Sequence, residues 1–250
     1  MSRLTTKDYW ENYYFNSTAE KDQIRQIVSN YDKYWDILVN NNSAFPPKNI
    51  LEIGGYPGRY LAYISDKYNL VPSSLDFNSD TKKVEEVMKT FDIKDFQIIQ
   101  ADVFEHVPTE KYDIVISIGF IEHFENFDAV LDRHVNYLND GGTLLVMVPN
   151  KRWFRKWYGY LVDYKNLKAH NLKSMKKSVF VDFGKRNNLE LLNLEYFGEF
   201  QYSLHHNPNL IQKIIYKLAK LFFKKINPYI KSHPTKYFSS VLIGVYKKRL

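Results

Sequence analysis

The stretch Asn49–Asp76, NILEIGGYPGRYLAYISDKYNLVPSSLD, decides the fold of this chain. Its apolar start, Ile50–Ile53, predicts a strand that is buried on both faces. Three glycines follow within five positions, and apolar residues then recur at helical spacing from 59 to 68. A second strand is expected over residues 71–77, and it brings Asp76 about 20 residues beyond the turn, where a βαβ unit presents a ribose-binding acid.

The glycine turn by itself predicts a ligand site at the start of a helix. Glycine lets the backbone approach a ligand closely, and the free N–H groups of the first helical turn point into the same space. A nicotinamide-binding domain has a similar pattern, and so does a loop that only closes a βα turn. The rest of the chain has to distinguish these interpretations.

Strand and helix patterns alternate after this stretch and predict an α/β fold. Short apolar runs separated by helical segments are typical of a doubly wound parallel sheet. Further strands are expected over residues 96–101, 112–118, 143–148, 189–200 and 238–246. Further helices are expected over 78–91, with Ser79 as N-cap, and over 127–138 and 174–187, with a turn at 139–142.

The pattern resembles class I S-adenosylmethionine (SAM)-dependent methyltransferases of the small-molecule type. Glu52 and the glycines Gly54 and Gly58 match their first motif, while Tyr56 replaces its middle glycine. Ala101-Asp102, the segment YDIVISIGFIEHF (112–124) and LLVMVPN (144–150) match the third, fourth and fifth strands and their loops. The resemblance implies a three-layer αβα fold whose seven-stranded, mostly parallel sheet has the order 3-2-1-4-5-7-6, with the last strand antiparallel.

The resemblance also implies which residues bind SAM. Asp76 would take the ribose hydroxyls, Asp102 would meet the adenine amino group, and the glycine turn would meet the methionine moiety. The loop after the fourth strand would lie beside the methyl-donating sulfur. The expected cofactor-binding residues are Glu52, Gly54, Gly55, Gly58, Asp76, Phe77, Asp102, Val103, Ser117 and Gly119.

The pair Glu122-His123 resembles a pair that follows the fourth strand in many small-molecule O-methyltransferases. His123 is the first candidate for a general base, with Glu122 beside it and His206 as a second candidate. The pair could instead only cap and orient the following helix. Related quinone O-methyltransferases add a metal-binding Glu three residues earlier, but Gly119 stands there in this chain, so no metal site is expected.

Three parts of the chain are expected. Residues 1–48 form an N-terminal helical cap, 49–150 the SAM-binding core, and 151–250 the rest of the sheet. The last part contains an aromatic and basic insertion at 150–171 and a basic amphipathic helix at 208–226, which would be either a packed helix or a membrane-surface helix. The expected substrate-binding residues are Tyr13, Trp153, Trp157, Tyr158 and His205.

Composition limits the chemistry and the partners. The chain of 250 residues has no Cys, which excludes a thiolate metal site and a Cys nucleophile. Residues 1–150 carry a net charge of −9 and residues 151–250 one of +16, so a negatively charged acceptor or an anionic membrane surface fits the second part. The chain shows neither a leader-like segment nor a long apolar run, so a cytoplasmic location, with peripheral contact at the inner membrane face, is expected.

These observations together predict a SAM-dependent methyltransferase that acts on a hydroxyl of a small molecule or glycan precursor. One alternative is an RNA methyltransferase that uses the basic C-terminal half, although no RNA-binding module is recognisable and nucleic acid is not the favoured partner. A second alternative is a non-catalytic SAM-binding subunit, because Tyr56 departs from the motif.

Overall fold

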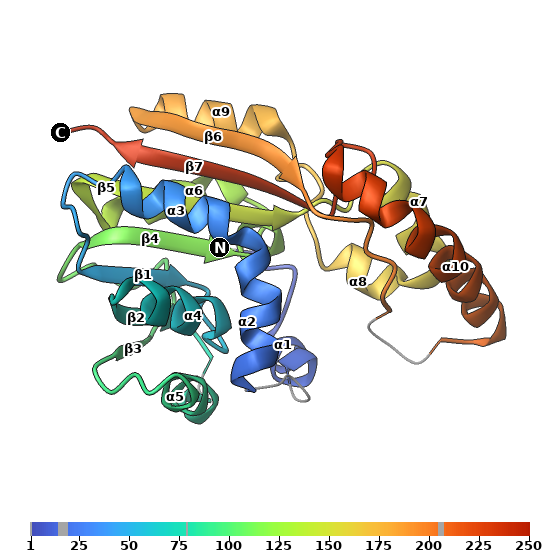
Figure 1. Ribbon diagram of the computed structural model, residues 1–250, viewed down its shortest axis with the longest axis horizontal. Helices are drawn as coiled ribbons and strands as arrows, with labels where there is room; N and C mark the ends of the chain where they lie inside the picture. Colours follow the sequence, from blue (N-terminus) through green and yellow to red (C-terminus); the bar gives the residue numbers. More distant parts are fainter. Residues whose placement is uncertain (1, 15–19, 79, 205–207) are drawn as a thin grey trace.

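A seven-stranded sheet forms the centre of the computed structural model, which describes residues 2–14, 20–78, 80–204 and 208–250. The strand order is β3-β2-β1-β4-β5-β7-β6, and β7 alone runs antiparallel to its neighbours (Figure 1). The predicted order and direction of the strands are therefore confirmed. The strands are β1 (Asn49–Ile53), β2 (Val71–Asp76), β3 (Gln97–Gln100), β4 (Tyr112–Ile118), β5 (Leu138–Pro149), β6 (Leu189–Phe197) and β7 (Val241–Lys248).

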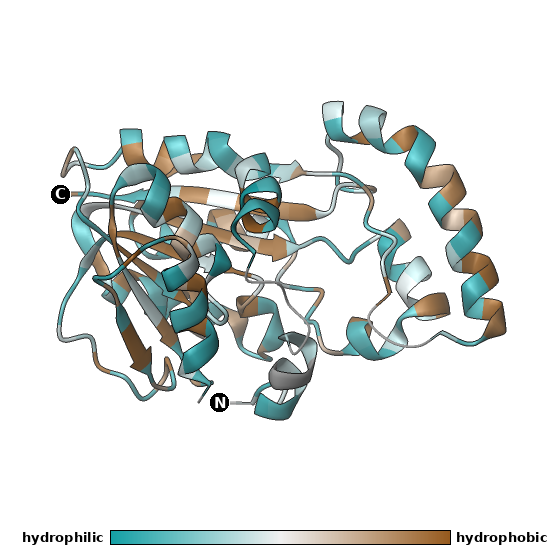
Figure 2. Cartoon of the chain, turned by 60° about the horizontal axis from the view of Figure 1, so that its bottom comes forward, coloured by the Kyte–Doolittle hydropathy of each residue, from teal (hydrophilic) through white to brown (hydrophobic). Residues whose placement is uncertain are grey.

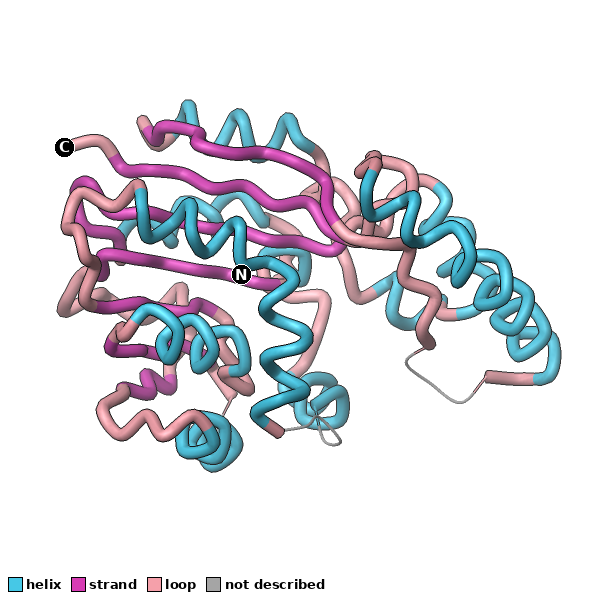
Figure 3. Tube along the Cα trace, in the orientation of Figure 1, coloured by secondary structure: helices cyan, strands magenta, loops and turns pink. Residues whose placement is uncertain are grey.

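Helices cover both faces of the sheet and make three layers (Figure 3). One face packs against α2 (Lys21–Val28), α3 (Asp32–Asn40), α4 (Arg59–Tyr68) and α5 (Thr81–Thr90). The other face packs against α6 (Phe127–Asn136) and α9 (Lys177–Arg186). The remaining helical segments are α1 (Lys7–Tyr14), η1 (Ser29–Tyr31), η2 (Ile121–His123), α7 (Phe154–Val162), α8 (Tyr164–Lys168) and α10 (Leu210–Ser232).

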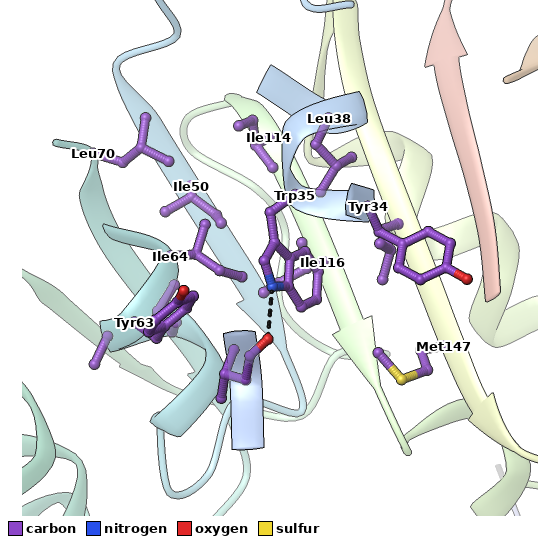
Figure 4. Close-up of a cluster of buried hydrophobic side chains, with 14 of the residues drawn as sticks. Tyr34, Trp35, Leu38, Ile50, Tyr63, Ile64, Leu70, Ile114, Ile116 and Met147 are labelled. Carbon is purple, nitrogen blue, oxygen red and sulfur yellow. Dashed lines mark hydrogen bonds between the residues drawn. The ribbon is translucent and has the colours of Figure 1, made fainter. Parts of the chain in front are cut away.

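Alternation along the central strands explains the two apolar cores. In β4, Ile114 and Ile116 face the core under α3 and α4, while Val115 faces the core under α6 and α9. Trp35 of α3 is fully buried in the first core, and its indole N–H donates to the carbonyl oxygen of Val28 at 3.2 Å (Figure 4). A large ring is thus buried without leaving its polar atom unpaired.

Several elements begin or end a few residues away from their predicted bounds. β5 begins at Leu138 and includes residues 139–142, where the sequence predicts a turn. The pairing of β5 with β4 shifts register between Tyr112 and Ile114, and Gly141 has a φ of +75°. Helix α5 begins at Thr81, after Asp80, whereas Ser79 lies outside the described residues. Helix α10 continues through Pro228 to Ser232, well beyond the predicted end at residue 226.

Helices α7, α8 and α10 lie beyond the ends of β4 and β5 and form a lobe beside the sheet (Figure 1). Apolar and polar residues alternate along the whole of α10 (Figure 2). A small third core joins this lobe to the sheet through Tyr158, Phe200 and Phe223. Among the described residues, no helix is long and apolar enough to cross a membrane.

Candidate active site

The glycine turn between β1 and α4 has the geometry that its sequence predicts. Gly54 (φ +73°) and Gly58 (φ +89°) both adopt the left-handed region that side chains disfavour. The N–H of Gly54 donates to the carbonyl oxygen of Leu75 at 2.8 Å, so the turn is fixed to the end of β2. Below the turn, a carboxylate oxygen of Glu52 accepts from the N–H of Leu61 at 3.3 Å. Burial raises the pKa of Glu52 to about 8.

Asp76 lies at the end of β2 with its carboxylate held by backbone donors. One oxygen accepts from the N–H of Asn78 at 2.8 Å, and the other accepts from the N–H of Tyr56 at 3.2 Å. Burial raises the pKa of Asp76, while these N–H groups act against that rise. Each oxygen keeps a further lone pair, so the carboxylate can accept from two hydroxyl groups.

Tyr56 departs from the glycine motif but does not fill the turn. Its ring packs edge-on against Tyr14 at 5.5 Å between centroids, and its hydroxyl group donates to Asp80 at 3.2 Å. Its main-chain N–H donates to the carboxylate of Asp76, as the N–H of a glycine would. The substitution therefore adds a ring to the wall of the site.

The N-terminal arm reaches the predicted adenine end of the site. The guanidinium group of Arg3 lies 2.6 Å from the Asp102 carboxylate and 4.3 Å from the centre of the Phe77 ring. Main-chain contacts hold the arm there, because the N–H of Leu4 donates to the carbonyl oxygen of His123 at 2.8 Å. Asp102, expected to meet the adenine amino group, is thus already paired with a cation. The sequence pattern gave no sign of this contact.

A cavity of about 320 Å³ opens beside the glycine turn and reaches the loop after β4. Glycines 54, 58 and 119 line it together with Glu52, and a smaller adjoining cavity is lined by Asp76 and Phe77. Gly55, Val103 and Ser117 are buried and line neither cavity. Aromatic side chains of the N-terminal cap form another wall; they are Tyr9, Trp10, Tyr13, Tyr14 and Tyr31.

Glu122 and His123 face this cavity from η2, the turn after β4. The ring nitrogen Nδ1 of His123 lies 2.7 Å from the carbonyl oxygen of Ala169, and Nε2 lies 3.5 Å from Oε1 of Glu122. Burial raises the pKa of Glu122 to about 8 and lowers the pKa of His123 to about 3. Burial therefore favours the uncharged form of both side chains.

The segment after β5 adds two cations and a second imidazole to the cavity. The ammonium group of Lys151 donates to Oδ1 of Asn166 at 2.6 Å, and burial lowers the pKa of Lys151 to about 7. Arg155 donates to the carbonyl oxygen of Ser240 at 3.2 Å. His170 lies beside His123, with 4.5 Å between ring centroids. Lys151, Arg155 and His170 all lie in the insertion predicted at 150–171, but they are not among the expected substrate-binding residues, because nothing in their spacing relates them to Glu122.

The structure places the expected substrate residues in different surroundings. Tyr13 lines the cavity. Trp153 and Trp157 are exposed and do not line it, and Tyr158 is buried in the third core, with its hydroxyl group donating to the carbonyl oxygen of Tyr202. Tyr158 therefore contributes to the apolar packing of the lobe and not to the wall of the cavity. His205 and His206 lie outside the described residues.

Comparisons with known proteins agree with this geometry. Residues 24–192, more than half of the chain, match the family described as "Methyltransferase domain". (S)-Coclaurine N-methyltransferase from Thalictrum flavum subsp. glaucum is 23% identical over 100 residues, which are 39% of this chain and 28% of that protein. The chain thus aligns with little more than a quarter of that relative's length.

Solved structures share the fold at low sequence identity. Coclaurine N-methyltransferase bound to N-methylheliamine and S-adenosylhomocysteine (SAH) superposes with a TM-score of 0.60 at 13% identity, covering 93% of this chain and 74% of that chain. A putative methyltransferase from Bacillus halodurans C-125 has a TM-score of 0.60 at 17% identity, covering 89% and 100%. The domain match, the strand order and the glycine turn lead to one conclusion: this chain belongs to the methyltransferase-domain family and has the Rossmann-like class I fold of SAM-dependent methyltransferases.

Proposed function

We propose that this protein transfers the methyl group of SAM to a hydroxyl group of a small molecule or glycan precursor. One observation carries the proposal: a single cavity has the glycine turn on one side and Glu122 with His123 on the other. Asp76, in the adjoining cavity, would accept from the ribose hydroxyls. A volume of about 320 Å³ is of the size that holds a small ligand.

The chemistry requires few groups of the protein. The acceptor oxygen attacks the methyl carbon, a C–O bond forms, and the C–S bond breaks with its electron pair going to sulfur, which leaves neutral SAH. Most of the rate comes from holding the oxygen in line with the C–S bond. The hydroxyl proton passes to Nε2 of His123, which keeps a free lone pair because Nδ1 donates to the carbonyl oxygen of Ala169.

The second wall of the cavity supports an acceptor with a negative charge. Lys151 and Arg155 line the same cavity as Glu122, so one ligand can contact all three side chains. An acceptor with a phosphate or carboxylate group would place that group at these cations and its hydroxyl group at Glu122 and His123. A cytoplasmic enzyme acting on metabolites or glycan precursors fits this proposal.

The outer face of the lobe supports a contact with an anionic membrane surface, which would make the location peripheral. Helix α10 exposes a row of aliphatic and aromatic side chains, and α7 beside it exposes Trp157 and Leu161. This row consists of Leu210, Ile211, Ile214, Leu218, Leu221 and Phe222. Lysines 213, 217, 220, 224 and 225 alternate with them, and the sequence has no acidic residue after Glu199.

Titration with SAH tests the cofactor site directly. Wild-type protein is expected to bind SAH, and Asp76→Ala is expected to bind it at least about tenfold more weakly, because two hydroxyl–carboxylate hydrogen bonds are lost. Isothermal titration calorimetry measures both, and Asp66→Ala, which changes a carboxylate on the outside of α4, serves as the control. Equal affinity of wild type and Asp76→Ala would contradict the proposed site.

Turnover distinguishes the alternatives. Release of SAH on addition of a hydroxylated anionic metabolite supports the proposed function. Turnover only with RNA would favour the RNA methyltransferase, and affinity that falls steeply with added salt would accompany it. SAH binding without turnover on any class of acceptor would favour a non-catalytic subunit.

A further inference from the structure

We propose that Glu122, His123 and His170 bind a divalent transition-metal ion at the acceptor end of the cavity. One ligand atom from each side chain lies within 4.8 Å of the other two. An ion about 2.0–2.2 Å from each ligand atom would draw the three atoms to roughly 3–4 Å from one another. The cluster therefore needs to tighten by less than about 2 Å, which side-chain rotation supplies.

The two imidazole rings are already oriented as metal ligands. Nδ1 of His123 lies 2.7 Å from the carbonyl oxygen of Ala169, and Nδ1 of His170 lies 2.6 Å from the carbonyl oxygen of Asn166. A carbonyl oxygen only accepts, so each Nδ1 carries the proton and each Nε2 keeps a lone pair. A hydrogen bond from Nδ1–H to a backbone carbonyl is the usual support of a metal-binding histidine.

The buried side chain of Glu122 is a second reason to propose a cation at this cluster. Its carboxylate is buried, and neither oxygen has a hydrogen-bond partner among the described residues. A buried carboxylate without a partner is costly, and a cation is the partner that satisfies both oxygens.

The third ligand is one that the sequence pattern could not supply. Gly119 stands where related enzymes place an additional carboxylate, and this had argued against a metal. The fold brings His170, 47 residues after His123, to the same place through α8 and the turn after it. Two nitrogen ligands and one oxygen ligand favour Zn²⁺, Co²⁺, Ni²⁺ or Fe²⁺ over Mg²⁺ and Ca²⁺, which prefer oxygen.

Two cations line the same cavity and oppose metal binding. Lys151 and Arg155 make their hydrogen bonds to Asn166 and to the carbonyl oxygen of Ser240, and their charges lower the affinity of any nearby cation. Replacing Lys151 by Met should therefore tighten metal binding. An increase in metal affinity in this variant would distinguish the proposed site from nonspecific metal uptake.

Three protein ligands leave coordination positions open to the cavity. An acceptor oxygen bound there would lose its proton more easily, which is how a bound cation activates hydroxyl groups. This role rests on the proposed methyl transfer, whereas metal binding itself does not. The readout is therefore metal binding.

Protein freed of metal with a chelator is titrated with Zn²⁺ by calorimetry and with Co²⁺ by visible absorption. Wild type is expected to bind one equivalent and to give a Co²⁺ spectrum with nitrogen ligation. His170→Gln and Glu122→Gln should lower the affinity at least about tenfold. His233→Gln, which removes an exposed histidine at the end of α10, should bind like wild type.

No uptake by wild type, or equal affinity of wild type and His170→Gln, would overturn the metal site. Thermal unfolding midpoints of the variants show whether each one folds. SAH titration of the same samples keeps the two proposals apart. SAH binding without metal uptake would remove only the metal, and metal uptake without SAH binding would remove the proposed methyl transfer.

Discussion

Gly54 shows how strictly a single residue determines the conformation of the glycine turn. Its φ is +73°, and an added Cβ would lie 2.3 Å from Cδ2 of Phe120. Gly54→Ala therefore combines backbone strain with overlap against a ring, and we expect it to lower the free energy of unfolding by about 2–4 kcal/mol and to weaken SAH binding. Urea denaturation and calorimetry measure the two effects.

Gly159→Ala is the matched control for this substitution. Gly159 lies inside α7, where an added Cβ would meet Leu167 at 3.6 Å, an ordinary contact. Alanine should stabilise that helix by about 0.5–1 kcal/mol. Loss of stability of the same size in both variants would contradict the role assigned to the turn at Gly54.

The sequence predicted the relative positions of those candidate site residues that belong to one local pattern. Glu52, the glycines and Asp76 belong to one βαβ unit, so their spacing fixes their relative positions. Lys151, Arg155 and His170 lie in the segment after β5, and only its folding back over the cavity brings them to Glu122. Arg3 reaches Asp102 across 99 positions of sequence, and no spacing rule relates them.

At the scale of elements, α10 shows both the strength and the limit of sequence patterns. Its amphipathic spacing predicted a helix, and the Asn209 capping box with Gln212 explains why it begins at Leu210. The helix continues through Pro228, although proline lacks an N–H donor and its ring crowds the preceding turn. The side chain of Asn227 accepts from the N–H of Phe200 at 3.0 Å and donates to the carbonyl oxygen of Phe200 at 3.1 Å. Tertiary contacts of this kind extend the helix to Ser232.

The exposed face of α10 leads to a prediction about membranes. Vesicles with anionic lipid should co-sediment with the wild-type protein, and replacing Lys213, Lys217, Lys220 and Lys224 by Gln should weaken binding by about 1 kcal/mol for each lysine near the surface. Replacing the exposed lysines 82, 89, 94 and 111 by Gln removes the same charge elsewhere and should change little. An equal loss of vesicle binding in both variants would show that only the net charge of the protein matters. Concentration-dependent self-association of the wild type would indicate that the exposed face of α10 binds a second copy of the chain.

At the scale of the whole molecule, the buried carboxyl groups of Glu52 and Glu122 make the free energy of unfolding depend on pH. Glu52 has a pKa of about 8 in the folded protein against an ordinary value of 4.5, so between these values the folded state holds a proton that the unfolded state has lost. The free energy of unfolding therefore falls as pH rises from about 4.5 to about 8. Glu122 acts in the same direction.

Denaturant titrations at pH 5 and pH 8 test this dependence. Glu52→Gln cannot ionise, so its stability relative to wild type should improve by about 1 kcal/mol or more between the two pH values. Glu85→Gln, at an exposed position of α5, is the control and should follow wild type. A wild type and a Glu52→Gln variant with parallel pH profiles would show that Glu52 ionises normally in the folded protein.

The path of the N-terminal arm has a practical consequence for handling this protein. Arg3 pairs with Asp102 and stacks on Phe77, so residues 2–4 lie at the predicted adenine end of the site. A purification tag fused before them would be anchored beside that end of the site and would slow exchange of the cofactor. Leu250 is 95% exposed and lies at the end of the molecule away from the α7–α10 lobe (Figure 1). A tag or surface linker attached there leaves the adenine end of the site clear, so immobilised assays of cofactor exchange should use the C-terminal end.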